Sequence, residues 1–428
     1  MEGLLAEESP LARLACVMVG LPARGKTYTA RKITRYLTWL GHRSRIFNVG
    51  NYRREAVGAE KKADFFDPQN IEFSTQRAAV AENALNDMLE WLCKGSPHQV
   101  TSAALNSPSL GTPLGAGLAP YRQMSVAGAG VGGPSRIALY DATNSTKERR
   151  QFIYDRCCEA NIKVFFVENI CDDDNLIMHN IKEVKLTSPD YVGWETQDAI
   201  NDFIKRIEHY AKSYESISAD EFGGAISFVK IFNIGKQVIA ISFYISRHGE
   251  SMYNLEGKIG GNSNLSPQGI SFAQKLQGVI ETIQTASFLN YPKLQWKQLD
   301  ELSSGSCDGL TYEEIEQRYP EDFMERDLDK FNYRYRGGES YRDLVHRLEP
   351  VILELERHKE EDPIYIIGHQ AVVRAIYAYF HGISHEELPY IKIPLHTIIK
   401  LTPKAYHCLE ERIVVDVPAV DTFRPKHH

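Results

Sequence analysis

The 428-residue chain has no long hydrophobic run and no C-x-x-C cysteine pair. Its longest apolar stretches, residues 15–21 and 238–245, are too short to cross a bilayer, which takes about 20 residues. The seven cysteines form no C-x-x-C pair and no His/Cys zinc spacing, which argues against structural disulfides. The first residues show no basic segment followed by an apolar run, so no secretory signal is evident. These absences favour a reducing, cytosolic location.

Acidic residues are missing from one long segment. Between Ser9 and Arg54 there is no Asp or Glu but ten Lys or Arg residues, although the whole chain carries a net charge of −7. An acidic chain is not expected to coat nucleic acid, whereas a local basic block is typical of a site for a small, highly charged anion. The segment therefore indicates an anionic ligand.

Short apolar segments alternate with helical patterns, which is typical of α/β domains. In the first half, strands are predicted at 15–20, 45–49, 137–140 and 163–167, with helices at 27–41 and 76–93, and the sheet is expected to be largely parallel. A second α/β unit has predicted strands at 238–246 and 363–367 and helices at 312–319 and 340–358. Residues 101–135, of which 22 are Gly, Pro, Ala or Ser, are predicted to form a surface loop of the first domain.

Residues 20–27 read GLPARGKT and match the phosphate-loop pattern G-x-x-x-x-G-K-[ST]. Gly20 and Gly25 permit a tight loop whose backbone N–H groups surround phosphate oxygens. Lys26 neutralises those oxygens and Thr27 offers its hydroxyl to Mg²⁺. A predicted strand and helix flank the loop, as the motif requires. The pattern therefore predicts a nucleotide site rather than an ordinary turn.

Asp141 directly follows the predicted strand 137–140. A carboxylate at the carboxyl end of a parallel strand suits a metal ligand or a general base for a substrate hydroxyl. A helix N-cap is the structural alternative, and the residue pattern leaves both open.

His248 in SRHGES and His369 in GHQAVVRA each follow an apolar strand and have Arg247 and Arg374 nearby. Such a pair suits phosphoryl transfer, in which one imidazole attacks phosphorus and arginines hold the equatorial oxygens. A core role for the histidines is the first alternative. A zinc site is the second, but no third ligand stands at a usable spacing.

Ten segments resemble, in order, the 6-phosphofructo-2-kinase/fructose-2,6-bisphosphatase family: GLPARGKTY, FNVGNYRRE, YDATNSTKERR, VKLTSPDYV, RHGES, GGNSNLSPQG, TYEEIEQRYP, YRYRGGESYRDLVHRLEPVI, GHQAVVRA and PLHTIIKLTP. The resemblance implies a P-loop NTPase-type, parallel-sheet kinase domain at 1–237. It implies a histidine-phosphatase (phosphoglycerate-mutase-like) α/β domain at 238–428, in a cytosolic homodimer. The kinase would make fructose 2,6-bisphosphate from ATP and fructose 6-phosphate with Mg²⁺. The phosphatase would remove the 2-phosphate through a phosphohistidine.

The resemblance also implies roles for single residues. Asp141 and Cys171 would belong to the kinase active site. His248 would be the phosphatase nucleophile, Glu301 would protonate the leaving hydroxyl, and His369 would support the transfer. ATP would be bound by Gly20, Leu21, Pro22, Ala23, Arg24, Gly25, Lys26, Thr27, Tyr28, Asn180 and Lys185. Fructose 6-phosphate would be held by Arg53, Arg77, Thr143, Arg149, Lys185, Arg206 and Tyr210. The phosphatase ligand would be contacted by Arg247, Asn254, Gly260, Tyr312, Arg326, Lys330, Tyr341, Gln370, Arg374 and Tyr406.

The chain departs from the family at three places. Segment 101–135 is inserted, which a loop absorbs because closure entropy grows only logarithmically with length. A helix and a strand expected before the RHGES strand are missing. A second strand, and the arginine that follows it and contacts the transferred phosphate, are also missing, and Glu281 stands in that arginine's place. Losing one such donor costs roughly 10²–10³ in rate, so we expect an active kinase and a weakened phosphatase.

Three alternatives remain. A polynucleotide kinase with a fused phosphatase would share the phosphate loop, but it would need an aromatic and basic channel for single strands, which this acidic chain does not display. A kinase-only enzyme, or a catalytically weak regulatory protein that binds sugar phosphates, would result if the departures disable one or both domains.

Overall fold

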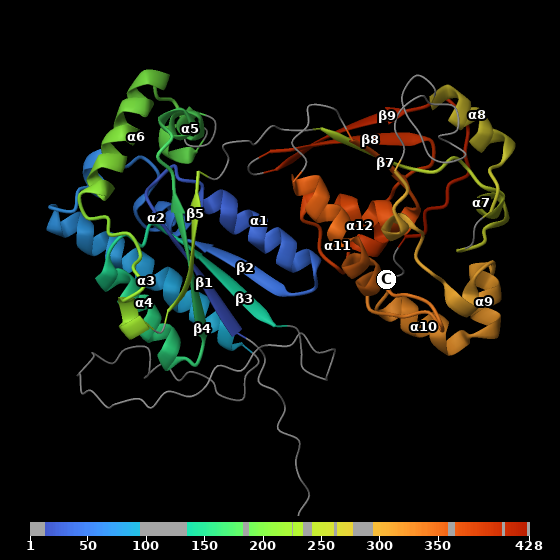
Figure 1. Cartoon of the computed structure of the whole chain (residues 1–428), viewed down its shortest axis with the longest axis horizontal. Coiled ribbons are helices and arrows are strands. Elements are labelled where there is room, and N and C mark those ends of the chain that lie inside the picture. The colour runs from blue at the N-terminus through green and yellow to red at the C-terminus, as the bar shows by residue number, and fades with distance from the viewer. Residues whose placement is uncertain are drawn as a thin grey trace, which may run out of the picture. The chain divides into compact units, whose positions relative to one another are not determined.

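The computed structural model describes residues 13–94, 135–182, 188–224, 226–233, 242–260, 263–276, 294–357, 364–404 and 407–425 (Figure 1). The chain divides into two compact units, Met1–Thr34 with His42–Lys236 and Arg35–Gly41 with Gln237–His428. The expectations for residues 101–134, Lys185, Glu281 and Tyr406 lie outside the described residues.

The first unit is built on a parallel sheet. Its strands are β1 (Arg13–Val19), β2 (Arg43–Asn48), β3 (Arg136–Asp141), β4 (Lys163–Ile170) and β5 (Ser227–Phe232), in the order β2-β3-β1-β4-β5. All four pairings are parallel, which confirms the expected architecture. The central strand β1 is almost entirely buried, as expected for a strand covered by helices on both faces. The four strands predicted for this half are confirmed within about three residues, and β5 was not predicted.

The helices of the first unit are α1 (Lys26–Trp39), α2 (Val49–Val57), α3 (Ile71–Cys93), α4 (Lys147–Glu159), α5 (Asp174–Asn180) and α6 (Thr196–Ala211), with short 3-10 turns η1 (Ala63–Phe66), η3 (Pro189–Tyr191) and η4 (Glu221–Gly224). A polar side chain caps the start of α2, α3, α4 and α5. Helix α3 begins five residues before the predicted start, because the Asn70 side chain accepts a hydrogen bond from the backbone N–H of Phe73. Its face with Leu85, Met88 and Leu92 belongs to the core beneath the sheet.

The second unit is built on a mixed sheet. Its strands are β6 (Phe243–Arg247), β7 (Ile364–Gly368), β8 (Thr397–Pro403) and β9 (Cys408–Val414), in the order β7-β6-β8-β9. Strands β6 and β7 are parallel, whereas β8 runs antiparallel to β6 and to β9. The two predicted strands are confirmed where the chain is described, and β8 and β9 were not predicted.

The helices of the second unit are α7 (Met252–Glu256), α8 (Pro267–Lys275), α9 (Tyr312–Arg318), α10 (Pro320–Leu328), α11 (Tyr341–Arg357) and α12 (Gln370–His381), with 3-10 turns η6 (Lys297–Leu299), η7 (Gly305–Cys307) and η8 (Leu388–Tyr390). The predicted apolar stripe of α11 is buried, including Leu344, Leu348 and Ile352. Helix α12 is buried from Ala371 to Phe380. Its first turn therefore lies in the interior, next to His369.

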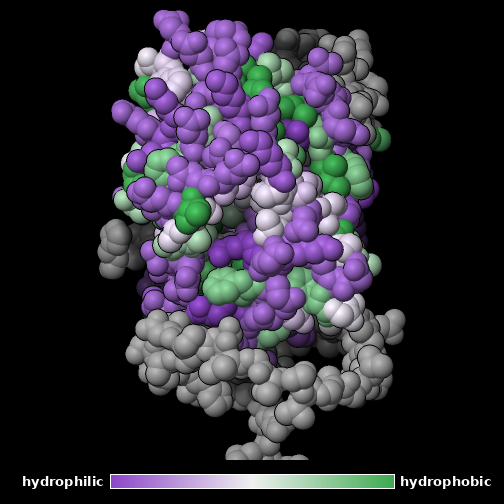
Figure 2. Space-filling model, turned by 90° about the vertical axis from the view of Figure 1, so that its left-hand side faces the viewer, coloured by the Kyte–Doolittle hydropathy of each residue, from purple (hydrophilic) through white to green (hydrophobic). Residues whose placement is uncertain are grey.

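Hydropathy is a further feature of the helices and of one face of the first unit. In the parts of the chain that the structure describes, no helix combines the length and apolar character needed to span a bilayer. Figure 2 shows a face of the first unit that is mostly hydrophilic, with hydrophobic residues in small groups. This face is typical of a surface exposed to water.

Candidate active sites

The phosphate loop connects β1 to α1, as the motif requires. Gly20 has φ of 134°, and a Cβ at this position would lie 2.4 Å from the backbone oxygen of Asn169 on β4. Its N–H donates to the carbonyl oxygen of Thr143 at 3.0 Å. Gly25 has φ of 82°. Both glycines are therefore required by backbone geometry, the first also by a close approach between strands.

Lys26 and Thr27 begin helix α1. The Lys26 side chain is buried, and its ammonium group donates to the carbonyl oxygen of Leu21 at 2.7 Å, within its own loop. Thr27 is partly exposed beside it. A glycine loop without room for a Cβ, followed by a lysine and a hydroxyl at a helix N-terminus, fits a nucleoside triphosphate with Mg²⁺.

Asp141 is the last residue of β3 and is buried. The Asn48 amide donates to its Oδ2 at 2.5 Å, and Asn48 itself ends the neighbouring strand β2. Helix α4 is capped by Thr146, whose hydroxyl accepts from the N–H of Arg149. The N-cap alternative for Asp141 is therefore wrong. The carboxylate instead lies at the sheet edge where β1 enters the phosphate loop.

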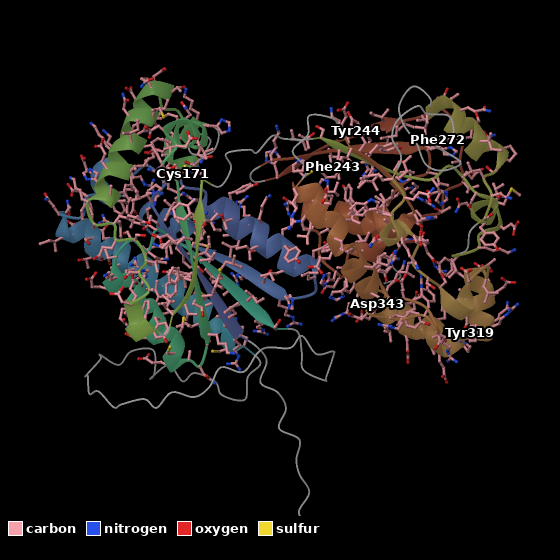
Figure 3. The ribbon with its side chains drawn as sticks, viewed as in Figure 1. Cys171, Phe243, Tyr244, Phe272, Tyr319 and Asp343 are labelled. Carbon is pink, nitrogen blue, oxygen red and sulfur yellow. The ribbon has the colours of Figure 1, made fainter. Side chains whose placement is uncertain are left out.

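Two further predicted residues lie near this edge. Cys171 directly follows β4 and is buried, with its sulfur 3.9 Å from the carbonyl oxygen of Asp173 (Figure 3). Asn180, at the end of α5, donates to the carbonyl oxygen of Ala23 in the phosphate loop at 3.1 Å. Burial lowers the pKa of Arg24, an effect that nearby Cys171 opposes. The structure thus brings Arg24, Cys171 and Asn180 together at the loop.

Three arginines meet at one carboxylate, Asp190. Arg53 Nη2 donates to both oxygens of Asp190 at 2.7 Å, and Arg206 and Arg54 approach the carboxylate at 3.4 and 3.5 Å. Burial by itself would raise the pKa of Asp190, but the hydrogen bond from Arg53 and the arginine charges hold it below its usual value. Sequence reasoning missed Asp190. Its only signal was membership of the quoted segment VKLTSPDYV.

The 3-10 turn η1 supplies an aromatic support for the same arginines. The guanidinium carbon of Arg206 lies 3.7 Å from the ring centroid of Phe66, and that of Arg53 lies 5.7 Å from it. The Tyr210 ring lies 5.9 Å from the Phe66 ring. Arg77 donates to the carbonyl oxygen of Phe65. Four predicted sugar-phosphate residues, Arg53, Arg77, Arg206 and Tyr210, therefore gather around η1.

The other predicted sugar-phosphate residues lie beyond the end of β3. Thr143 follows Asp141 by two residues, and Arg149, in the first turn of α4, donates to the Tyr140 hydroxyl at 2.9 Å. They therefore belong to the same sheet edge as Asp141. The hydrogen bond of Arg149 to Tyr140 and its contact with Phe152 lie outside the group around η1.

Arg53, Arg54 and Arg206 form an arginine group around Asp190, and some hydrogen-bond donors of this group have no acceptor in the part of the chain that the structure describes. Among the described residues, the buried Nε atoms of Arg53 and Arg206 have no hydrogen-bond acceptor. A buried donor without an acceptor costs about 1–3 kcal/mol, and more when it is charged. Such donors in a basic group are typical of a site that an anion completes.

His248 and His369 follow the parallel neighbours β6 and β7, so they lie at one edge of the second sheet. Their ring centroids are 5.0 Å apart. His248 Nδ1 lies 2.7 Å from the carbonyl oxygen of Gly249, which can only accept, so Nδ1 carries the proton and Nε2 keeps its lone pair. Burial, with the charges of Arg247 and His369, lowers the pKa of His248 to about 3. The imidazole is therefore neutral at pH 7, as a nucleophile must be.

Two buried arginines lie near the histidines. Arg247 Nη1 donates to the Thr422 hydroxyl at 2.7 Å, and its Nε has no acceptor among the described residues. Burial lowers the pKa of Arg247 to about 10, while the charge of Glu301 opposes that shift. Arg374 donates to the Tyr341 hydroxyl at 3.1 Å. The two guanidinium groups could hold phosphate oxygens at His248.

Further predicted ligand contacts gather around Tyr312. Arg326 donates to the Tyr312 hydroxyl at 3.1 Å and to the Tyr335 hydroxyl at 2.9 Å. Lys330 donates to the carbonyl oxygen of Pro389 at 3.3 Å. Burial, with the charges of Arg326 and Arg374, lowers the pKa of Lys330 well below its usual value. A bound anion would oppose this shift and favour the protonated amine.

The remaining predicted residues have mainly local contacts. Asn254 forms a capping box with Ser251 at the start of α7. Gly260 has φ of 67° and has no room for a Cβ beside Asp308. Glu301 accepts a hydrogen bond from the N–H of Leu302 at 2.9 Å. Gln370 is the first residue of α12.

Neither structural alternative for the histidines finds support. No group of three His, Cys, Asp or Glu side chains within the described ranges could hold a metal ion, so the zinc alternative has no ligand set there. Both rings lie at strand ends among polar side chains. Glu250, a polar neighbour of His248 with no predicted role of its own, is buried and accepts from the Ser266 hydroxyl at 2.6 Å and the Val420 N–H at 2.8 Å.

Comparison with protein families matches 6-phosphofructo-2-kinase to residues 2–108 and 132–251, and the histidine phosphatase superfamily (branch 1) to residues 275–415. A Saccharomyces cerevisiae protein named fructose-2,6-bisphosphatase is 41% identical over 97% of this chain and 91% of its own length. A protein named 6-phosphofructo-2-kinase/fructose-2,6-bisphosphatase from Aquarana catesbeiana is 41% identical over 96% of this chain and 86% of its own length. A Homo sapiens protein named 6-phosphofructo-2-kinase/fructose-2,6-bisphosphatase 1 has the same identity and coverage.

Among solved structures, the alpha-ribazole phosphatase from Shigella flexneri is 18% identical and covers 42% of this chain and 99% of its own, with a TM-score of 0.38. That likeness is too distant to support a conclusion. The sequence relatives are decisive, because they cover nearly all of the chain and both halves match family models in the expected order. The chain therefore belongs to the 6-phosphofructo-2-kinase/fructose-2,6-bisphosphatase family.

Proposed function

We propose that the first unit phosphorylates fructose 6-phosphate at O2 with ATP, and that the second unit hydrolyses the resulting 2-phosphate through His248, more slowly than is usual in the family. One observation carries the kinase assignment. The phosphate loop, whose position 20 admits only glycine, lies in the same unit as a buried group of arginines whose Nε atoms have no acceptor among the described residues. The relatives named for both activities support the pairing of the two reactions.

In the kinase reaction, the chain holds two anionic substrates and moves one proton. MgATP, when bound, supplies the phosphoryl group and a metal ion that neutralises phosphate charge. Lys26 and Thr27 hold the phosphates at the start of α1. Asp141 accepts the proton of the sugar O2 hydroxyl as that oxygen bonds to the γ-phosphorus and the bond to ADP breaks. The buried position of Asp141 at the end of β3 suits this role.

The arginine group selects the sugar phosphate. Arg53 and Arg206 bind its 6-phosphate, supported by Asp190 on one side and by the ring of Phe66 on the other. Guanidinium groups suit this task because they donate several hydrogen bonds to phosphate in a fixed geometry. The site therefore favours a phosphorylated sugar over a free sugar.

In the phosphatase reaction, His248 Nε2 attacks phosphorus and the bond from phosphorus to O2 breaks. Arg247 and Arg374 hold the phosphate oxygens, and Glu301 protonates O2 as it leaves. Water then attacks the phosphohistidine and releases inorganic phosphate. The neutral, oriented His248 ring supports this assignment.

The weakened phosphatase rests on the sequence alone. Glu281 stands where the family has an arginine that contacts the transferred phosphate, and it lies outside the described residues. A carboxylate near phosphate repels it, and one missing donor slows such reactions by roughly 10²–10³. A kinase-only enzyme, or a regulatory protein that binds sugar phosphates, is the alternative if no hydrolysis occurs.

The decisive test supplies purified protein with MgATP and fructose 6-phosphate and measures an acid-labile bisphosphate, with Lys26→Ala as the control. Failure to form product would overturn the kinase assignment. Fructose 2,6-bisphosphate labelled in its 2-phosphate is then added, and label on the protein is measured with His248→Ala as the control. Hydrolysis as fast as that of the Aquarana catesbeiana relative, assayed in parallel, would contradict the weakening.

We also infer a homodimer in the cytosol, as the resemblance implies. Light scattering on the purified protein would give twice the chain mass for a dimer. Fractionation of cells that express the chain would place it with the cytosolic proteins, and recovery in a membrane pellet would contradict this location.

A further inference from the structure

The segment 418–425 contacts residues of the phosphatase domain near His248 and Tyr312. It belongs to no helix or strand. Asp421 pairs with Lys392 at 2.7 Å, and the Phe423 ring lies 5.3 Å from the same ammonium group. Thr422 and Arg424 contact other residues, which belong to the phosphatase site.

Two hydrogen bonds fix this segment beside the nucleophile. The N–H of Val420 donates to Glu250 Oε2 at 2.8 Å, and Glu250 follows His248 by two residues. The Thr422 hydroxyl accepts from Arg247 Nη1 at 2.7 Å. Arg247 is buried and adjacent to His248, and the Thr422 hydroxyl and the Ile393 carbonyl oxygen both accept from its Nη1.

Arg424 joins the cations around Tyr312. Its guanidinium carbon lies 4.4 Å from the Tyr312 ring centroid and 5.3 Å from that of Phe323. The guanidinium carbon of Arg326 lies 4.7 Å from the same Tyr312 centroid. The charge of Arg424 also acts on Lys330, whose pKa is lowered mainly by burial and by Arg326. Arg326, Lys330 and Arg424 therefore form one cationic group.

This group has few ion pairs among the described residues, although the charges of Asp327 and Glu313 act on Lys330 and Arg424. Arg326 pairs with Asp327 at 2.9 Å. Across the ranges that the structure describes, neither Lys330 nor Arg424 forms an ion pair with a carboxylate. Like charges held close together in a partly buried site repel each other, and a bound dianion would offset that repulsion.

We propose that Arg424 is a specificity-determining residue of the phosphatase, which binds the phosphate that His248 does not attack. The inference rests on the proposed function, since a substrate with two phosphates needs two cationic sites. Arg247 serves the first at His248. The cations gathered around Tyr312 serve the second, the 6-phosphate of the sugar.

The test compares fructose 2,6-bisphosphate with fructose 2-phosphate, which lacks the second phosphate. We expect Arg424→Ala to raise the KM for the bisphosphate about tenfold, with kcat changed less than about twofold and the KM for fructose 2-phosphate unchanged. Arg424→Lys should restore part of the affinity, because it keeps the charge and loses the planar donors. An equal effect on both substrates, or no effect, would overturn the proposal.

Lys392→Ala is the matched control. It removes one cation and releases Asp421 on the outer side of the segment, but takes no charge from the Tyr312 group. If Arg424→Ala acts only by loosening the segment, Lys392→Ala should raise the same KM equally. Should the wild-type chain hydrolyse neither substrate, the phosphatase half of the proposed function fails. The rise in thermal midpoint that each compound causes in the wild type and in Arg424→Ala then tests the role of Arg424 in binding separately.

Discussion

Arg53 and Asp190 form a buried ion pair in which one guanidinium nitrogen donates to both carboxylate oxygens at 2.7 Å, with each side chain only 5% exposed. Arg206 and Arg54 approach the same carboxylate. Asp190 therefore organises a group of three arginines. Under the proposed function this group binds the 6-phosphate of the sugar, and the proposed role of Asp190 is to position the arginines.

Asp190→Asn tests this role. The amide keeps the shape of the side chain but removes its charge, and a hydrogen bond to a charged group contributes about 1.5–3 kcal/mol. We expect the KM for fructose 6-phosphate to rise about tenfold or more, with kcat reduced less than about threefold and the KM for MgATP unchanged. Steady-state kinetics with each substrate varied in turn would measure this.

Asp202→Asn provides the matched control. Asp202 accepts from the N–H of Ala63 and from the Tyr191 hydroxyl, both at 2.9 Å, and pairs with no arginine among the described residues. The Asp202→Asn substitution should lower the thermal stability of the chain without changing the KM for fructose 6-phosphate. Equal KM changes in the two variants would show that Asp190 only supports the local fold.

Gly20→Ala is expected to abolish nucleotide binding. The new Cβ would lie 2.4 Å from the carbonyl oxygen of Asn169, and φ of 134° is unfavourable for any residue with a side chain. The loop could not move far enough to relieve this conflict and still direct its N–H groups at the phosphate. MgATP should raise the thermal midpoint of the wild type but leave that of the variant nearly unchanged.

Gly193→Ala separates strain from steric conflict. Gly193 also has a positive φ, of 81°, but an added Cβ would meet nothing within 4 Å. This variant should lose some stability and keep its response to MgATP. A normal MgATP response in Gly20→Ala would contradict the steric argument.

The sequence predicted the features that are local along the chain. The phosphate loop, the two strand–histidine junctions and the apolar stripe of α11 each fall within a short segment, so spacing and periodicity suffice. Asp190 and Thr422 were missed because their partners, Arg53 and Arg247, are 137 and 175 residues away. Strand β9 carries no apolar run because most of its side chains are exposed, and β8 pairs with β6, which is distant along the chain.

Glu281→Arg should restore phosphatase activity if that residue faces the transferred phosphate. The change replaces a repelling carboxylate with a donor, and one donor in such a site contributes roughly 10²–10³ in rate. We expect release of phosphate from fructose 2,6-bisphosphate to increase at least about tenfold, with the kinase rate unchanged. Glu354→Arg, a charge reversal at an exposed position on α11, is the control and should leave both rates unchanged. No gain in Glu281→Arg would mean that the residue points away from the site.

Acid should destabilise the chain partly through His248. An unfolded histidine titrates near pH 6.5, whereas burial holds the pKa of His248 in the folded chain at about 3. Below pH 6.5 the unfolded chain therefore binds a proton that the folded chain does not, and the free energy of unfolding falls as the pH decreases toward 3. The contribution of this one group is up to about 1.4 kcal/mol per pH unit.

His248→Gln removes that titration while keeping a side chain of similar size. We expect the loss of unfolding free energy between neutral pH and about pH 5, measured by urea denaturation, to be smaller in this variant than in the wild type. His346→Gln, at an exposed position on α11, should lose as much as the wild type. An identical acid response in His248→Gln and the wild type would mean that His248 is protonated as readily in the folded chain as in the unfolded one. Burial beside Arg247 would then not explain why the His248 imidazole is neutral at pH 7.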